Sequence, residues 1–261
     1  MCISPIMVHG LRKDGTTYGA TVPCGKCVEC SKAVSTEWAF RICQEASLYD
    51  YNCCLTLTYD NEHLPDGEVL VRRDIQLFLK SLRKHVSPRK IRVFYSGEYG
   101  SLRGRPHFHC IVFNYMPPDL VEFSHRKGRT FYTSKTISDL WKRGNILVGE
   151  VDFHTAFYTA KYLQKCIDFG KPVKPFVGMS TRPGIGYAFA TPKCLETDKI
   201  YVDGKTHKIP RYYLKVLKRE GYSTLEVELW REMRMLMAQD NADIDCILAR
   251  EKRVHEFLAK K

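Results

Sequence analysis

The sequence GRPHFHCIVF (residues 104–113) places two histidines directly before an apolar run. Such a run is typical of a buried β-strand, in which alternate side chains point to the same face of the sheet. His107 and His109 are therefore expected on one face, and Phe108 and Cys110 on the other. Two buried imidazoles need polar partners, and one shared cation would satisfy both. The pattern favours a metal site over two unrelated buried histidines.

A third metal ligand is available on the preceding strand. The run IRVFYSG (91–97) predicts a strand, and Glu98 follows it directly. The loop 100–106, which is rich in Gly and Arg, would fold this strand and the histidine strand into a hairpin. Two imidazoles and one carboxylate leave coordination positions open, which suits Mn²⁺ or Mg²⁺ better than a closed structural zinc. We therefore expect His107, His109 and Glu98 to bind Mn²⁺ or Mg²⁺.

The remaining pattern predicts an α+β domain around this hairpin. A strand is expected at 53–60, a helix at 75–86, a second helix at 134–142 and a strand at 145–151, followed by a helix from 153. The order β-α-β-β-α-β is the split βαβ pattern, as in ferredoxin-like folds. It predicts an antiparallel sheet with its helices packed on one face, and with the other face free for a ligand.

Three segments are expected along the chain. Residues 1–50 form a cysteine-rich extension with one helix, 51–220 form the domain that holds the histidines, and 221–261 form a helical tail. Residues 171–220 are rich in Pro, Gly and basic residues and receive no assignment. The tail is expected to pack through apolar residues at helical spacing, namely Leu225, Val227, Trp230, Met233, Leu236 and Met237.

The helix expected from residue 153 carries tyrosines on its polar face. Tyr158, Tyr162 and Lys165 share one side of a helical wheel, so we expect the tyrosines to act chemically and not to fill the core. The opposite side should pack on the sheet and consists of Phe153, Ala156, Ala160, Leu163 and Ile167. Ionising a phenol at pH 7 costs about 4 kcal/mol, and the metal or Lys165 can offset much of this. His154 and Lys161 are assigned at most a phosphate contact.

Charge and composition point to a nucleic-acid partner. The formal net charge is +12, and residues 71–105 hold ten Lys or Arg against two acidic residues. Such a field attracts polyanions. The start, MCISPIMVHG, does not read as a signal peptide, and no apolar run approaches the roughly 20 residues of a membrane helix. Together with eleven cysteines, this favours reduced thiols in a cytoplasm and no membrane partner.

These motifs resemble those of a known family. From Cys2 to about Leu217 the chain is similar to the replication initiation proteins of the gokushovirus branch of microviruses, which are phages with single-stranded DNA. These proteins belong to the HUH class of rolling-circle nickases, named for a histidine–hydrophobic–histidine motif. The resemblance is carried by PCGKCVEC, EWAFRICQEA, LTLTYDNEHLP, SGEYGSLRGRPHFHCIVF, LWKRGNILVGEV, YTAKYLQK, MSTRPGIG and PRYYLKVL.

The resemblance implies an enzyme that starts and ends rolling-circle replication. It would nick the phage origin, hold the cut strand as a 5′-phosphotyrosine ester, and rejoin it. Tyr158 and Tyr162 would alternate as nucleophiles with Lys165 beside them, in the cytoplasm of the bacterial host. The substrate would be single-stranded origin DNA, and a host helicase or polymerase is a candidate partner that no residue identifies. We assign DNA contacts to four arginines of the basic segment, Arg72, Arg73, Arg103 and Arg105.

The cysteines near the amino terminus predict a second metal site. Cys24, Cys27 and Cys30 stand in a C-x2-C-x2-C array, whose thiolates could bind a structural Zn²⁺. We take Cys2 as the fourth ligand because the matching segment includes it, with His9 or Cys43 as alternatives. Free buried thiols and an iron–sulfur cluster remain open as other interpretations.

Two other functions fit parts of the pattern. A transposase or plasmid relaxase could use the same chemistry, although the cysteine loop and the lack of a helicase domain argue against it. A non-catalytic, zinc-dependent binder of single-stranded nucleic acid would use a similar sheet, but it should carry aromatic residues where this chain has histidines.

Overall fold

The structure is a computed structural model that describes residues 2–11, 15–100, 104–126, 128–161, 171–196, 199–202 and 205–229. The chain forms two compact units, one of Met1–Val34 with Ala190–Lys261 and one of Ser35–Phe189, and each is described by itself. These units differ in extent from the predicted segments 1–50, 51–220 and 221–261, which stay a prediction.

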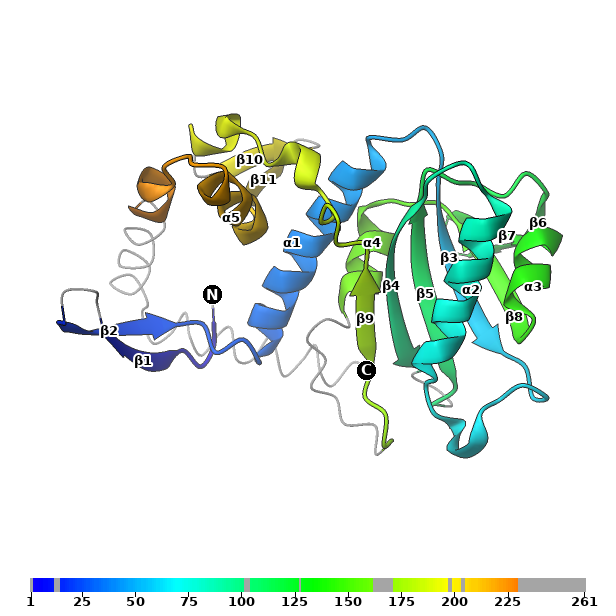
Figure 1. The fold of residues 1–261 in the computed structure, drawn as a ribbon. Helices are drawn as coiled ribbons and strands as arrows, with labels where there is room; N and C mark the ends of the chain where they lie inside the picture. The colour runs from blue at the N-terminus through cyan, green and yellow to red at the C-terminus, as the bar shows by residue number, and fades with distance from the viewer. Residues whose placement is uncertain are drawn as a thin grey trace. The chain divides into compact units, whose positions relative to one another are not determined.

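The larger unit is built on one seven-stranded antiparallel sheet (Figure 1). Its strands, in spatial order, are β6 (Leu120–Arg126), β7 (Arg129–Ser134), β8 (Gly144–Gly149), β3 (Asn52–Tyr59), β5 (Pro106–Phe113), β4 (Arg92–Tyr99) and β9 (Phe176–Met179). The predicted α+β class with a large antiparallel sheet is confirmed. Strands β6, β7 and β9 lie at the two sides of the sheet and were not predicted.

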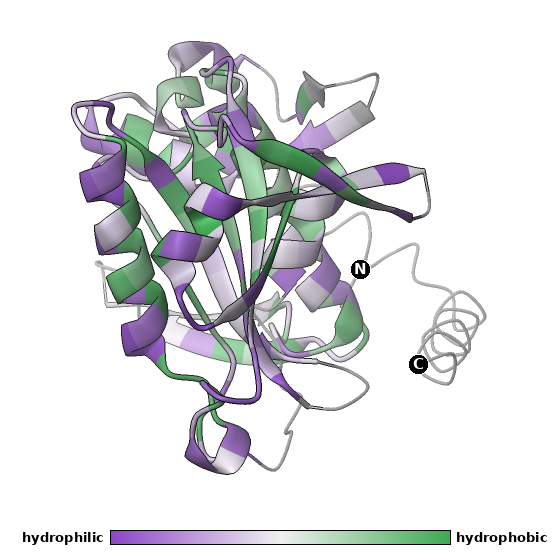
Figure 2. Cartoon of the chain, turned by 90° about the vertical axis from the view of Figure 1, so that its right-hand side faces the viewer, coloured by the Kyte–Doolittle hydropathy of each residue, from purple (hydrophilic) through white to green (hydrophobic). Residues whose placement is uncertain are grey.

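One face of the sheet is covered by α2 (Arg72–His85) and α3 (Lys135–Trp141). In Figure 1, α2 crosses in front of β4, β5 and β3. The helices bury an apolar stripe against every second residue of the central strands. This core includes Ile75, Phe78, Leu79 and Leu82 from α2, Trp141 from α3, and Leu55, Leu57, Phe108 and Cys110 from the strands. Figure 2 shows the matching alternation of hydrophobic and hydrophilic residues along the helices.

The other face is covered in part by α4 (Phe153–Ala160) and by the later residues of α1 (Val28–Ala46). The buried residues here include Ala39 and Ile42 from α1, Ala156 and Ala160 from α4, and Phe94, Ile111 and Phe113 from the strands. The prediction that helices cover one face only is therefore wrong. The apolar stripe of α4 was located correctly, but a helical period does not tell which face of a sheet the helix will cover.

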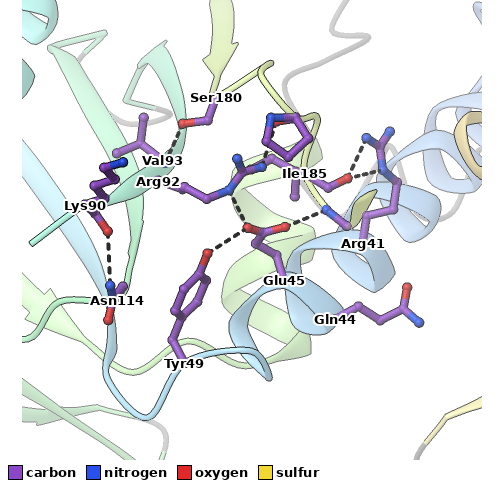
Figure 3. Close-up of polar contacts among 12 residues, drawn as sticks. Arg41, Gln44, Glu45, Tyr49, Lys90, Arg92, Val93, Asn114, Ser180 and Ile185 are labelled. Atoms are coloured by element: carbon purple, nitrogen blue, oxygen red, sulfur yellow. Dashed lines mark hydrogen bonds and ion pairs between the residues drawn. The ribbon is translucent and has the colours of Figure 1, made fainter. Parts of the chain in front are cut away.

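A buried polar network joins α1 to the segment after β9 (Figure 3). The carboxylate of Glu45 accepts hydrogen bonds from the side chain of Arg92 and, at 2.7 Å, from the amide of Gly186. Arg41 donates two hydrogen bonds to the carbonyl of Ile185, at 2.8 and 3.1 Å. Because these buried charges meet both a counter-charge and backbone groups, the network fixes residues 183–186 on α1.

The smaller unit has little sheet and one well-formed helix. Its elements are the hairpin of β1 (Ile6–Leu11) and β2 (Thr17–Val22), the start of α1, the hairpin of β10 (Lys199–Val202) and β11 (Lys205–Lys208), and α5 (Arg211–Arg219). Short 3-10 turns occur at Asp66–Glu68, Tyr187–Phe189 and Pro192–Leu195.

The predicted helical tail is described only at its start. Val227 is buried and Leu225 is exposed, whereas the predicted packing residues from Trp230 onward lie outside the described residues. No helix in the described ranges is long and apolar enough to cross a membrane.

Candidate functional site

The two histidines lie at the centre of the large sheet. On β5, His107 pairs with Glu98 of β4 and with Thr58 of β3, while His109 pairs with Ser96 and Thr56. Since Phe108 and Cys110 point into the core under α2, the histidines face the opposite side, which α4 partly covers. The predicted orientation of the pair therefore matches the structure.

The three predicted ligands of the catalytic metal converge on one point. Glu98 Oε1 lies 2.8 Å from His107 Nε2 and 3.0 Å from His109 Nε2. The two imidazole rings stand edge to face with their centres 5.0 Å apart. One ligand atom from each residue lies within 4.8 Å of the other two. This spacing is compatible with a single ion bound between them.

The surroundings orient both rings with Nε2 toward the carboxylate. His107 Nδ1 lies 3.1 Å from the carbonyl of Arg105, which can only accept, so this nitrogen carries the proton and a neutral ring leaves Nε2 as a base. His109 Nδ1 lies 3.1 Å from the hydroxyl of Thr56. A partner on the remote nitrogen is the usual arrangement of a metal-binding histidine.

Burial and charge make the group a fitting place for a cation. The side chain of Glu98 is 1% exposed, and its second oxygen, Oε2, is buried without a hydrogen-bond partner in the structure. Burial alone would raise the pKa of Glu98, but the hydrogen bonds from His107 and His109 hold that pKa at about 2. Burial lowers the pKa of His109. A buried carboxylate with an unpartnered oxygen, facing two imidazole nitrogens, is a donor set that a divalent metal satisfies.

Tyr158 reaches the same carboxylate from α4. The helix starts at a capping box in which Asp152 and Thr155 exchange hydrogen bonds, and this fixes the direction of the first turn. The Tyr158 hydroxyl donates to Glu98 Oε1 at 3.2 Å, and its ring stands edge to face with His109 at 5.1 Å between centres. The residue is 37% exposed, so the phenol can be approached from solvent.

The charge nearest the phenol is negative. Burial and the carboxylate of Glu98 raise the pKa of Tyr158. A phenolate therefore needs a cation to offset Glu98. The ammonium of Lys161 lies 4.8 Å from the centre of the Tyr158 ring, where sequence analysis gave it only a minor role. Tyr162 and Lys165, the other predicted catalytic residues, lie outside the described residues.

The predicted DNA-contacting arginines lie in different environments. Arg105 donates to the carbonyl of Tyr59 at 2.8 Å and to the side chain of Asn61, so it ties the start of β5 to the loop after β3. Arg72 and Arg73 are on α2, which covers the face opposite the histidines, and the guanidinium of Arg72 stacks over Phe176 at 4.2 Å. Arg103 lies outside the described residues. Their contact with DNA stays a prediction.

Thr56 is a site residue that the sequence analysis missed. Its hydroxyl is the partner of His109 Nδ1. The signal was present in LTLTY (55–59), where threonines alternate with apolar residues in a buried strand, so that Thr56 and Thr58 share one face.

The predicted cysteine ligands also come together, in the smaller unit. One sulfur from each of Cys2, Cys24, Cys27 and Cys30 lies within 4.8 Å of the other three. Neither His9, on β1, nor Cys43, in the later part of α1, belongs to this group. Hydrogen bonds from the amides of Lys26 and Cys27 lower the pKa of the Cys24 thiol to about 6.

Comparison with known proteins identifies the class first. Residues 52–167, which contain the central strands and the histidine–tyrosine site, match a family of replication-associated proteins that is named for its member ORF2. No solved structure matches the chain significantly.

The relatives then specify the family. The chain is 31% identical to the replication-associated protein ORF2 of Spiroplasma virus 4, over 91% of this chain and 87% of that protein. It is 31% identical to the replication-associated protein VP4 of Bdellovibrio phage phiMH2K, over 90% and 78%. It is 33% identical to the replication-associated protein ORF4 of Chlamydia phage 1, over 77% and 55%. The chain belongs to the replication-associated proteins of microviruses, as the sequence motifs predicted.

Proposed function

We propose that this chain is a metal-dependent DNA nickase and strand transferase of the HUH class, which starts and ends rolling-circle replication of a phage genome. The observation that carries the proposal is the convergence of Tyr158, His107 and His109 on one oxygen of Glu98. A phenol beside a three-residue metal-binding group is the minimum that such a reaction needs.

The topology supports the proposal independently of the site. The central strands lie in the spatial order β8-β3-β5-β4 and follow the chain order β3-α2-β4-β5-α3-β8. This is the split βαβ arrangement, which we propose to be the HUH core. The hairpin of β6 and β7 is an insertion between β5 and α3.

Three residues would hold the metal, Mn²⁺ or Mg²⁺. His107 and His109 would each offer Nε2, and Glu98 would offer its carboxylate, including the oxygen that now lacks a partner. Once bound, the ion would polarise the scissile phosphate and offset the charge of Glu98 at the phenol. Thr56 and the carbonyl of Arg105 would keep the rings in the required tautomer.

The reaction would join tyrosine to the 5′ side of the break. The oxygen of Tyr158 attacks the phosphorus, a P–O bond to tyrosine forms, and the bond to the 3′ oxygen of the preceding nucleotide breaks. The phenol loses its proton to solvent and the 3′ oxygen takes one from solvent, so no proton is gained or lost overall. Rejoining is the reverse attack by a 3′ hydroxyl. Tyr162 would serve as the second nucleophile and Lys165 as a phosphate contact.

The test uses single-stranded DNA of the phage that encodes the chain, cut into overlapping fragments and labelled at either end. With Mn²⁺, we expect a covalent adduct on a denaturing gel that carries a 3′ label and not a 5′ label. Replacing both Tyr158 and Tyr162 with Phe should abolish the adduct, and the single variants show which tyrosine acts first. Tyr222→Phe is a matched control, because Tyr222 is exposed in the smaller unit.

Two outcomes would overturn the proposal. An adduct that survives in the double variant would exclude the tyrosines as nucleophiles. DNA binding without any adduct, under all metals tested, would leave the alternative of a non-catalytic binder. We propose single-stranded origin DNA as the partner and the host bacterial cytoplasm as the place of action, while a host helicase or polymerase stays an untested candidate.

A further inference from the structure

Four cysteines from three separate segments meet in the smaller unit. Cys2 comes from the amino-terminal segment, Cys24 and Cys27 from the loop that follows β2, and Cys30 from the first turn of α1. Their sulfurs all lie within 4.8 Å of one another, and all four are free thiols. The group is separate from the histidine–tyrosine site, which belongs to the other unit.

The spacing of the sulfurs fits one tetrahedral ion. Four sulfurs at about 2.3 Å from a zinc ion lie about 3.8 Å from one another. The Cys2 and Cys27 sulfurs are 3.8 Å apart. A disulfide would need about 2.05 Å, and a cluster of several irons would spread its cysteines beyond the span of a single ion.

Backbone amides point at the sulfurs. The Cys24 amide donates to Cys2 Sγ at 3.2 Å, and the amides of Lys26 and Cys27 donate to Cys24 Sγ at 3.4 and 3.3 Å. These bonds orient the thiolates and spread their charge, as hydrogen bonds around metal ligands do. We propose that Cys2, Cys24, Cys27 and Cys30 form a closed structural zinc site.

The region around these cysteines has little else to hold it. The hairpin of β1 and β2 is isolated, and Ile6, Met7 and Leu11 on β1 are exposed by 48%, 61% and 71%. A two-stranded hairpin is marginal in water without a packed face. The zinc ion replaces the missing core by fixing three segments at one point, and its binding free energy becomes folding free energy.

The experiment measures metal in the full-length protein. We expect about one zinc per chain and no iron by elemental analysis, after purification without added metal. Cys24→Ser and Cys27→Ser should lose the zinc, whereas Cys43→Ser should keep it, because Cys43 is a cysteine of the same helix α1 outside the group. Cobalt bound in place of zinc should show the intense absorption of tetrahedral thiolate ligation, and this absorption should be lost in the same variants.

Further variants separate this site from the proposed nickase. Zinc content should be unchanged in the His107→Ala, His109→Ala double variant, and zinc loss should speed proteolysis within residues 1–34. Iron in place of zinc, no metal at all, or equal loss of zinc in Cys43→Ser would each overturn the proposal. None of these results depends on whether the protein cuts DNA.

Discussion

The phenol of Tyr158 and the carboxylate of Glu98 share a hydrogen bond of 3.2 Å, on the oxygen that both histidines also contact. The pairing keeps the phenol protonated, because the carboxylate and burial both raise the pKa of Tyr158. The same carboxylate that would bind the metal therefore restrains the nucleophile in the metal-free protein. This dual role makes Glu98 the most informative residue of the site.

Glu98→Gln should have two opposite effects. In the metal-free protein the pKa of Tyr158 should fall, because a neutral amide no longer disfavours the phenolate. Nicking with Mn²⁺ should nevertheless drop by at least about 100-fold, because one metal ligand is lost. The pKa can be followed by NMR of tyrosine labelled at Cζ, with Tyr158→Phe to assign the signal. A Tyr158 pKa that does not move in Glu98→Gln would show that the carboxylate does not control the phenol.

Thr56→Val should weaken metal binding without removing a ligand. The hydroxyl of Thr56 is the partner of His109 Nδ1, and loss of such a partner lowers metal affinity by about 10- to 100-fold. Titration calorimetry with Mn²⁺ measures the affinity directly. Thr58→Val is the matched control, because Thr58 lies on the same face of β3 opposite His107 and its hydroxyl has no hydrogen bond among the described residues. Equal loss in the two variants would argue for a general effect on the strand.

The centre of the site could be predicted because it depends on local patterns. Alternation along residues 107–113 placed both histidines on one face, and the short loop before them placed Glu98 opposite His107. The apolar stripe of α4 likewise follows from helical spacing, and Ala156 and Ala160 are buried as expected. Each of these inferences needs only the period of one element or the length of one turn.

The parts that escaped prediction depend on contacts between distant segments. Strand β9 is four residues long, and it is held by pairing with β4 and by close packing of Phe176 on Gly97, where an added Cβ would lie 2.9 Å from the ring. Neither residue signals the other in the sequence. The choice of sheet face by α4 is of the same kind, because it depends on where the chain crosses after β8.

Acid should remove a stabilising contribution of Glu98. In the metal-free fold its pKa is about 2, whereas an unperturbed Glu titrates near 4.3. A carboxyl with a depressed pKa stabilises the fold above the unfolded-state value, and this contribution, about 3 kcal/mol, is lost as pH falls from about 4.3 toward 2. In urea unfolding with chelator present, the stability difference between wild type and Glu98→Gln should shrink over that range. The exposed Glu150→Gln should show no such convergence.

Gly144→Ala should damage both the fold and the site. Gly144 begins β8 with φ of +133°, and a Cβ there would lie 2.2 Å from the amide nitrogen of Asp60 and 2.5 Å from the carbonyl oxygen of Thr58. Backbone cannot yield as a side chain can, so β3 and β8 must separate, and we expect a loss of about 3 kcal/mol or more in urea unfolding. Gly104→Ala is the control, because its φ of +62° carries a similar backbone strain but an added Cβ meets nothing within 4 Å, so about 1 kcal/mol is expected. Because β3 carries Thr56 behind His109, Gly144→Ala should also weaken Mn²⁺ binding, and equal stability loss in the two glycine variants would contradict this account.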